Sequence, residues 1–197
     1  MSKMHFAESE EKWLKLRVKH ITGSDVGGIL GYNKHLTLQH VRDGKHCFEN
    51  KTKKNFLMEL GSNFENKLAR IYKEWHHNPY YISKCKRFMA TCDFVSKNEH
   101  TLIEVKTTTG EARFKELMTV PKTILYQIIH QYICSGAKFK EVYLVIYLID
   151  KSGKSLDRST IELQNLPKVY PPQEEATLDE FYQEVIVKKN TTYEQSK

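Results

Sequence analysis

Apolar residues recur along the chain in patterns that predict a succession of helices and strands. Over residues 62–77 they repeat at helical spacing, which predicts an amphipathic helix. Pro121 begins a second apolar segment that Gly136 ends, as expected for a helix with proline at its start and glycine after its end. The run VYLVIYLI, residues 142–149, is almost wholly apolar and is typical of a strand covered on both faces.

Two more strands are predicted over residues 86–95 and 101–108, joined by the polar turn SKNEH. Side chains alternate along a strand, so Glu104 and Lys106 share one face of the second strand and Val105 lies on the other. If the two strands pair through this turn, Asp93 on the first strand lies near Glu104.

The remaining segments complete an α/β pattern. They comprise a helix ending near residue 19, a short helix within residues 21–31 with Ser24 as its N-cap, a loop over 45–54, a linker or short helix over 110–120, a strand near 160–163 and a terminal helix from about residue 177. This order predicts a mixed β-sheet flanked by helices. We expect a single domain over residues 1–197, with a C-terminal strand and helix extension from about residue 151.

The composition changes this picture mainly through its charge. The 197 residues are 40% hydrophobic and 28% charged, which is ordinary for a globular protein, but the net charge is +7. A basic chain favours a polyanionic partner, and nucleic acid is favoured over a membrane surface because no basic amphipathic helix stands out. No apolar run approaches the ~20 residues needed to span a bilayer.

The N-terminal segment is charged from its start and lacks the apolar core of a signal peptide. Four widely spaced cysteines form no C-x-x-C pair, which argues against a zinc ribbon or a closely spaced iron–sulfur motif. We therefore expect reduced thiols in an intracellular protein, cytoplasmic or nuclear and not secreted.

Asp93, Glu104 and Lys106 form the set most suggestive of chemistry. Two converging carboxylates would suit Mg²⁺ or Mn²⁺, and an adjacent lysine would orient the attacking water or stabilise charge on a phosphate. Ordinary explanations stand beside this one. Asp93 favours a strand-end turn, and Glu104 with Lys106 would also fit a solvated sheet face.

Three other polar residues have equally plain interpretations: Glu65 lies at the edge of its apolar helical stripe, Ser24 would cap a helix and Gln127 would be polar surface. What favours a shared function is the order in which all these residues occur. WLKLRVKHITGSDVGGILG, LGSNFENKLARIY, MATCDFVSKNEHTLIEVKTT and YQIIHQYICSGAKFKEVYLVIY together resemble the phage lambda exonuclease and YqaJ-like viral recombinase family, within the PD-(D/E)xK nuclease superfamily.

The resemblance implies a restriction-endonuclease-like core with a metal site. Asp93, Glu104 and the backbone carbonyl of Val105 would be metal ligands, and Glu65 would contact the metal through a water molecule. Lys106 would be the catalytic lysine. A second group would hold a terminal 5′-phosphate; its members are Arg17, Ser24, Thr91 and Gln127.

The chain departs from the family pattern in two places. Cys92 and Phe94 flank Asp93 where the family has proline and glycine. In the glutamine-containing helix, Gln127 matches the first of two glutamines, but Ile129 replaces the second, for which His130 or Gln131 would have to substitute.

The function implied by the resemblance is a Mg²⁺-dependent DNA nuclease, with Mn²⁺ as an alternative cofactor. It would be a 5′→3′ exonuclease on linear double-stranded DNA, acting in recombination or repair. A ring-shaped homotrimer and a single-strand annealing protein are the partners the family suggests, besides DNA; no membrane partner is expected. Two alternatives stay open: a related endonuclease or single-strand exonuclease, and a non-catalytic basic DNA-binding or assembly protein.

Overall fold

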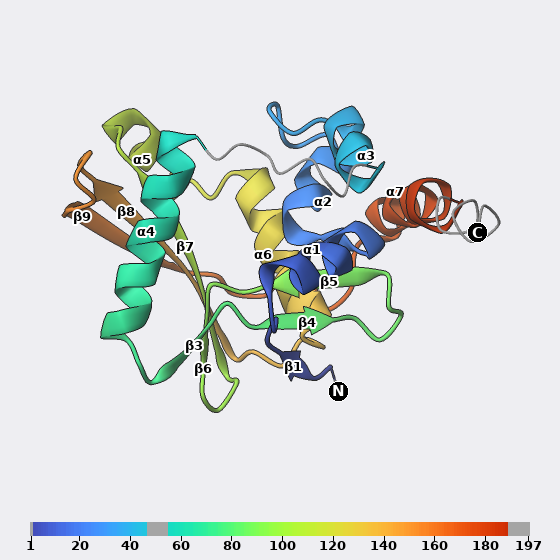
Figure 1. Ribbon diagram of the computed structural model, residues 1–197, viewed down its shortest axis with the longest axis horizontal. Helices are drawn as coiled ribbons and strands as arrows, with labels where there is room; N and C mark the ends of the chain where they lie inside the picture. Colours follow the sequence, from blue (N-terminus) through green and yellow to red (C-terminus); the bar gives the residue numbers. More distant parts are fainter. Residues whose placement is uncertain (1, 47–54, 189–197) are drawn as a thin grey trace.

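Two β-sheets lie among helices in the computed structural model of the protein, which describes residues 2–46 and 55–188 (Figure 1). The helices are α1 (Glu10–Lys19), α2 (Gly23–Ile29), α3 (Leu38–His46), α4 (Phe56–Ile71), α5 (Glu111–Met118), α6 (Lys122–Cys134), α7 (Pro172–Phe181) and the π-helix η1 (Tyr182–Val187). The strands are β1 (Met4–His5), β2 (Ile21–Thr22), β3 (Trp75–His77), β4 (Tyr80–Ile82), β5 (Phe88–Thr91), β6 (Phe94–Ser96), β7 (Thr101–Thr108), β8 (Glu141–Ile149) and β9 (Ser155–Glu162). The mixed α/β architecture is confirmed.

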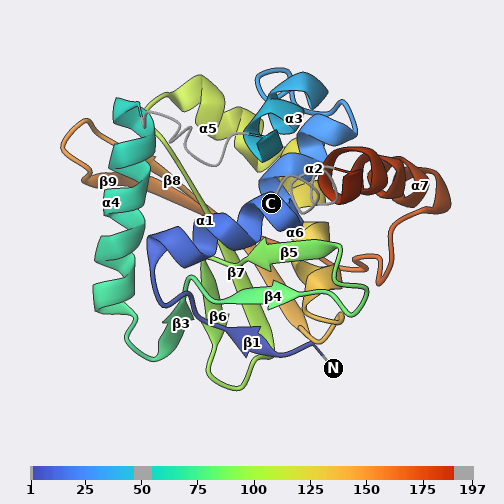
Figure 2. The same cartoon turned by 45° about the vertical axis from the view of Figure 1, so that its right-hand side comes forward.

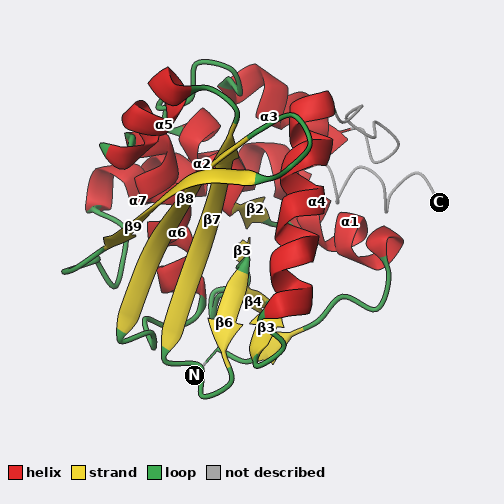
Figure 3. Cartoon of the chain, turned by 90° about the vertical axis from the view of Figure 1, so that its left-hand side faces the viewer, coloured by secondary structure: helices red, strands yellow, loops and turns green. Residues whose placement is uncertain are grey.

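The larger sheet has the strand order β3-β6-β7-β8-β9 and contains the long strands β7 and β8 (Figure 3). These two pair in parallel from Thr101↔Glu141 to Thr108↔Leu148, and the other pairs in this sheet are antiparallel. A parallel pair needs a crossover connection, which α5 and α6 supply here. The strand expected over residues 101–108 is confirmed at both ends.

Helices cover both faces of this sheet. On one face, Phe64 and Leu68 of α4 pack on Val105, Val145 and other apolar residues of the strands. On the opposite face, α6 contributes to a separate and larger apolar cluster that also contains alternate residues of β7 and β8. β8 therefore belongs to both clusters, which confirms that its apolar run is covered on two sides.

The smaller sheet has the strand order β1-β4-β5-β2 and lies beside α1 (Figure 2). β2 and β5 pair in parallel and the other neighbours are antiparallel. β2 leads directly into α2, so this sheet fixes the point from which α2 departs.

Three predicted boundaries differ from the structure. The helix predicted over residues 62–77 is α4, which begins at Phe56 and ends at Ile71; residues 75–77 form β3, held by antiparallel pairing with β6. Ile71, one of the apolar residues at helical spacing in the predicted helix, is 68% exposed. The strand predicted over residues 86–95 is divided into β5 and β6, which belong to different sheets. The terminal helix begins at Pro172 rather than near Thr177.

Local sequence explains several ends of helices. Ser9 caps α1 by accepting a hydrogen bond from the backbone N–H of Lys12. Gly136 has a φ of +81° just after α6, a conformation that glycine adopts without strain, so the predicted end of this helix is confirmed. Within the loop predicted over residues 45–54, residues 45 and 46 belong to α3, and residues 47–54 lie outside the described part. Across the described residues, no helix combines the length and apolarity that a membrane crossing requires.

Candidate active site

Asp93 and Glu104 meet where β6 begins beside β7. Phe94 pairs with Ile103, so the antiparallel register places the preceding Asp93 opposite Glu104. The Oδ2 atom of Asp93 accepts a hydrogen bond from the backbone N–H of Val105 at 2.7 Å. The two carboxylates therefore come together as expected, even though Cys92 and Phe94 replace the proline and glycine of the family pattern.

Glu104 has no exposed surface, and its carboxylate accepts hydrogen bonds from three side chains. Lys106 donates to Oε1, and Gln127 donates to the same oxygen at 2.6 Å. Gln131 donates to Oε2 at 2.6 Å and also to the backbone carbonyl of Thr91 at 2.9 Å. Buried carboxylates require such partners, and here α6 supplies two of them.

Glu65 joins this group from α4. Gly61, one turn earlier, lies so close to β7 that an added Cβ would stand 2.9 Å from the Thr107 hydroxyl oxygen. Residues four apart share a helix face, so Glu65 is directed toward the same strand. Its negative charge contributes to raising the pKa of both Asp93 and Lys106.

The electrostatics of the group favour a cation. Burial and the charges of Glu104 and Glu65 raise the pKa of Asp93 well above its usual range, despite the opposing effect of Lys106. Burial lowers the pKa of Lys106, but the charges of Glu104 and Asp93 outweigh it and leave that pKa above its ordinary value. Several carboxylates thus share one low-dielectric region, which a divalent cation would stabilise.

The donor atoms also fit a hard cation such as Mg²⁺, which prefers oxygen ligands. In residues 2–46 and 55–188, no three acidic, histidine or cysteine side chains already stand in a metal-binding arrangement. The backbone supplies a further oxygen. The N–H of Val105 points at Asp93, away from β8, and the C=O of a strand residue points to the same side as its N–H.

Arg17, Ser24 and Thr91 come together around Trp13. The Nη2 atom of Arg17 donates to the Ser24 hydroxyl at 3.1 Å, and the guanidinium lies 4.6 Å from the centre of the Trp13 ring. The indole N–H of Trp13 donates to the Thr91 hydroxyl at 3.2 Å. Sequence reasoning did not include Trp13 among the site residues, although four-residue spacing on α1 places it next to Arg17.

Ser24 is not the cap of its helix. Thr22 occupies the N-cap of α2, its hydroxyl paired with the Asp25 carboxylate at 2.7 Å and its backbone N–H donating to the same oxygen at 2.8 Å. Ser24 was predicted to be the N-cap because it precedes the apolar residues of this short helix. The helix begins earlier, at Gly23, which leaves the Ser24 hydroxyl for Arg17.

α6 joins the two groups of residues. Gln131 bridges the side chain of Glu104 and the backbone of Thr91, while Gln127 lies against Gly23, where an added Cβ would be 3.3 Å from its Cγ. Gln127 thus binds Glu104 and also lies against Gly23, the first residue of α2 and the residue before Ser24. The carboxylate group and the Arg17 group are neighbouring parts of one site.

Of the two residues considered as substitutes for the second glutamine, Gln131 and not His130 lies at the site. Both Gln127 and Gln131 bind Glu104 because residues four apart share a helix face. His130 points elsewhere: its Nε2 lies 3.1 Å from the carbonyl oxygens of Ile21 and Met89, and its Nδ1 lies 2.6 Å from the Tyr170 hydroxyl. The polar side chains of α6 are therefore divided between the site, which Gln127 and Gln131 face, and the interior, where His130 lies.

Comparisons with known proteins agree with this arrangement. Residues 12–138 match the model of the YqaJ-like viral recombinase domain. No curated protein sequence matches the chain. The fold is similar to that of an alkaline exonuclease (LHK-Exo) from Laribacter hongkongensis, with 18% identity and a TM-score of 0.66 over 94% of this chain and 97% of that chain. The same exonuclease solved in complex with dAMP gives 17% identity, with the same TM-score and coverage.

A phage-related exonuclease from Haemophilus somnus 129PT shares 12% identity, with a TM-score of 0.59 over 94% of this chain and all of that chain. At such identities the likeness establishes a common fold, and it confirms the expected restriction-endonuclease-like core. The family match and this fold together support a nuclease. Because the matched region spans more than half of the sequence, the chain belongs to the YqaJ-like viral recombinase domain family.

Proposed function

We propose that the protein is a metal-dependent deoxyribonuclease that digests linear double-stranded DNA from its 5′ ends and leaves a 3′ single strand for recombination or repair. The observation that carries the proposal is the fully buried Glu104, held by Lys106, Gln127 and Gln131 beside Asp93. A buried ion pair generally adds no more stability than apolar residues of the same size would, so the presence of a buried carboxylate here favours a chemical role.

Asp93, Glu104 and the carbonyl of Val105 are the proposed ligands of Mg²⁺ or Mn²⁺, with Glu65 in support. A bound cation would stabilise charge developing on the scissile phosphate and favour ionisation of the attacking water. Glu104 already accepts two hydrogen bonds at Oε1 and one at Oε2. A carboxylate has about four acceptor positions, so Oε2 is the atom we propose for the metal contact.

Lys106 is proposed to act on the phosphate or on the water. Its ammonium is held by Glu104 and by the charge of Asp93, and its raised pKa keeps it protonated at neutral pH. A fixed positive charge in a buried region stabilises a transition state more strongly than the same charge in water.

Arg17, Ser24 and Thr91 are proposed to bind the 5′-phosphate of the DNA end. An arginine fork beside two hydroxyls suits a phosphate dianion, and the group adjoins the carboxylates through Gln127 and Gln131. Such a pocket would fix the end of one strand next to the site of cleavage, which is what a 5′→3′ direction requires. A ring-shaped homotrimer, and an annealing protein that takes up the 3′ strand, complete the proposal.

The test is digestion of three DNA substrates by the purified protein with Mg²⁺: linear duplex with 5′-phosphate ends, linear duplex with 5′-hydroxyl ends, and covalently closed circles. We expect the phosphorylated ends to be digested fastest, the circles to be spared and EDTA to stop all cleavage. Cleavage of closed circles would instead identify an endonuclease. DNA binding without any cleavage would identify a non-catalytic binding protein.

A further inference from the structure

A buried lysine, Lys45 near the end of α3, lies directly behind the Arg17 group. It is 4% exposed, and its Nζ donates to the Oδ2 atom of Asp25 at 2.6 Å. It also donates to the backbone carbonyls of Arg17 and His20, each at 2.7 Å. An ammonium has three protons, and these three acceptors use all of them. Lys45 therefore acts through the groups that it holds and not by contacting DNA.

The hydrogen bonds that start at Lys45 form a closed ring. Asp25 accepts from Thr22, the Thr22 hydroxyl lies 3.1 Å from the Ser24 hydroxyl, and Ser24 accepts from the Arg17 guanidinium at 3.1 Å. The ring thus returns to the residue whose backbone carbonyl Lys45 binds. Lys45 therefore acts on Arg17 in two ways. It binds the backbone carbonyl of Arg17 directly, and through Asp25 and Thr22 it holds Ser24, the residue that binds the Arg17 guanidinium.

The charges in this ring show why the lysine matters for an anion. Burial raises the pKa of Asp25, but the charges of Lys45 and Arg17 outweigh it and leave the pKa below its ordinary value. Asp25 is therefore an anion that attracts both cations. With Lys45 bound to it, Asp25 is satisfied without drawing the Arg17 guanidinium inward. Without Lys45, the buried carboxylate would compete with a phosphate for Arg17.

We propose that the buried Asp25–Lys45 pair positions Arg17 and Ser24 and thereby sets the preference of the protein for phosphorylated DNA ends. The inference rests on the proposed function, because it assigns a cause to the end preference. Lys45 and Asp25 are positioning residues, since neither contacts the substrate.

The test compares the cleavage rate on 5′-phosphorylated linear duplex with the rate on 5′-hydroxyl duplex, expressed as a ratio for each variant. In Lys45→Met we expect the ratio to fall at least fivefold, because Asp25 draws Arg17 away from the phosphate. In the double variant Asp25→Asn/Lys45→Met, position 25 carries no negative charge that could compete with the phosphate for Arg17. The side-chain amide oxygen at that position can still accept hydrogen bonds from Thr22. Its ratio should lie between those of Lys45→Met and the wild type.

Lys19→Met is the matched control, since it removes one lysine charge from the exposed side of α1. Its ratio should stay within twofold of the wild type. A purely structural role of the pair predicts that both rates fall together in Lys45→Met and the ratio is unchanged, which would overturn the inference. If Lys45→Met does not fold, as judged by circular dichroism, the double variant decides: a wild-type ratio in it would overturn the inference.

Failure of the proposed function is distinguishable from failure of this inference. A wild-type protein that digests both kinds of end equally has no 5′-phosphate pocket, whatever Lys45 does. Arg17→Ala gives the second check, because it should abolish the preference if the pocket exists. A wild-type preference that Arg17→Ala removes and Lys45→Met leaves intact would contradict only the role of the buried pair.

Discussion

Glu104 receives hydrogen bonds from one ammonium and two amides while it has no contact with solvent. Glu104→Ala, like Asp93→Ala, should abolish cleavage, because either change leaves too few anionic ligands to hold Mg²⁺. DNA binding should survive or tighten, since a negative charge leaves a phosphate-facing site. Cleavage of linear duplex and fluorescence anisotropy of a labelled duplex measure the two effects.

Glu8→Ala is a suitable control for this prediction, because it removes a carboxylate from the exposed start of the chain. It should leave the cleavage rate unchanged. Substantial cleavage by the Glu104→Ala protein would show that these carboxylates are not the active site.

Lys106 is a separate case, since its ammonium acts on the phosphate or the water and not on the metal. Lys106→Ala should slow cleavage by on the order of 10²–10³, the usual cost of removing one preorganised charge. Mg²⁺ binding, followed by titration calorimetry, should persist. Lys97→Ala, in the exposed turn between β6 and β7, is the control and should cleave normally. A near-normal rate in Lys106→Ala would reduce Lys106 to a structural partner of Glu104.

At the scale of elements, the close approach of α2 and α3 depends on one glycine. A Cβ at Gly28 would stand 2.4 Å from the carbonyl oxygen of Leu36 and 2.8 Å from Val41, whereas a Cβ at Gly27 would meet only ordinary contacts at 3.6 Å or more. Gly28→Ala should therefore destabilise the protein by about 1–3 kcal/mol. Gly27→Ala should be neutral or stabilise it by up to about 1 kcal/mol.

Urea unfolding of the two variants measures this difference, and helix propensity cancels because both lose a glycine from α2. Gly28→Ala should also weaken the 5′-end preference, since α3 carries Lys45 against α2. Equal stability of the two variants would show that the loop around Leu36 yields to the added methyl group.

The elements also show how far the sequence can be interpreted by itself. β7 was predicted at both ends because alternation and its flanking turn are local signals. The division between β5 and β6 was not predictable, because its causes are distant: the backbone N–H of Cys92 binds the carbonyl of Pro79, and the N–H of Asn78 binds the carbonyl of Asp93. These bonds place Asp93 at the junction of two sheets.

The same distinction applies to the site. Asp93, Glu104 and Lys106 were singled out by their order and spacing together with the family resemblance, and Gln127 by the resemblance alone. Trp13 and Lys45 were not, because nothing in their own segments shows that one lies against Thr91 and the other against Asp25. Thr22 was missed for a local reason, since two hydroxyl residues, Thr22 and Ser24, lie next to the first residue of the same short helix.

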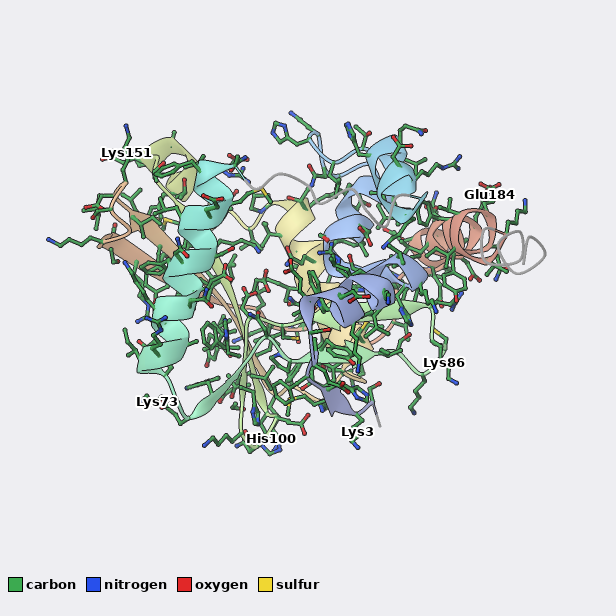
Figure 4. The ribbon with its side chains drawn as sticks, in the orientation of Figure 1. Lys3, Lys73, Lys86, His100, Lys151 and Glu184 are labelled. Carbon is green, nitrogen blue, oxygen red and sulfur yellow. The ribbon has the colours of Figure 1, made fainter. Side chains whose placement is uncertain are left out.

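For the molecule as a whole, positive charge is spread over several sides. The labelled lysines Lys3, Lys73, Lys86 and Lys151 point outward from different parts of the surface (Figure 4). A net charge of +7 distributed in this way attracts DNA without selecting its end. We expect end selection to depend instead on the residues around Arg17, which is where the proposed variants act.

Global stability should depend on pH through His130, which joins α6 to β2, β5 and the segment before α7. Burial lowers its pKa to about 4, so the unfolded chain takes up a proton at higher pH than the folded protein. The stability associated with neutral His130 is complete above pH ~6.5 and is lost as the pH falls toward 4. This loss reaches about 3 kcal/mol.

Urea unfolding between pH 4 and 7 tests this dependence. His130→Gln should be less stable than the wild type at pH 7 and should lose less stability on acidification, because the titrating group is gone. His100→Gln, in an exposed turn, is the control and should follow the wild-type curve. Parallel curves for the wild type and His130→Gln would contradict the prediction.

The parallel pairing of β7 with β8 has a consequence for biosynthesis. Asp93, Glu104 and Lys106 leave the ribosome well before the residues of α6 that bind Glu104 and before the strand that holds β7 in place. A nascent or prematurely terminated chain that stops before residue 141 contains every proposed metal ligand but lacks β8, the strand that pairs with β7 along its whole length. We therefore expect such shortened chains to be inactive, and the proposed nuclease activity to arise only once synthesis has passed β8.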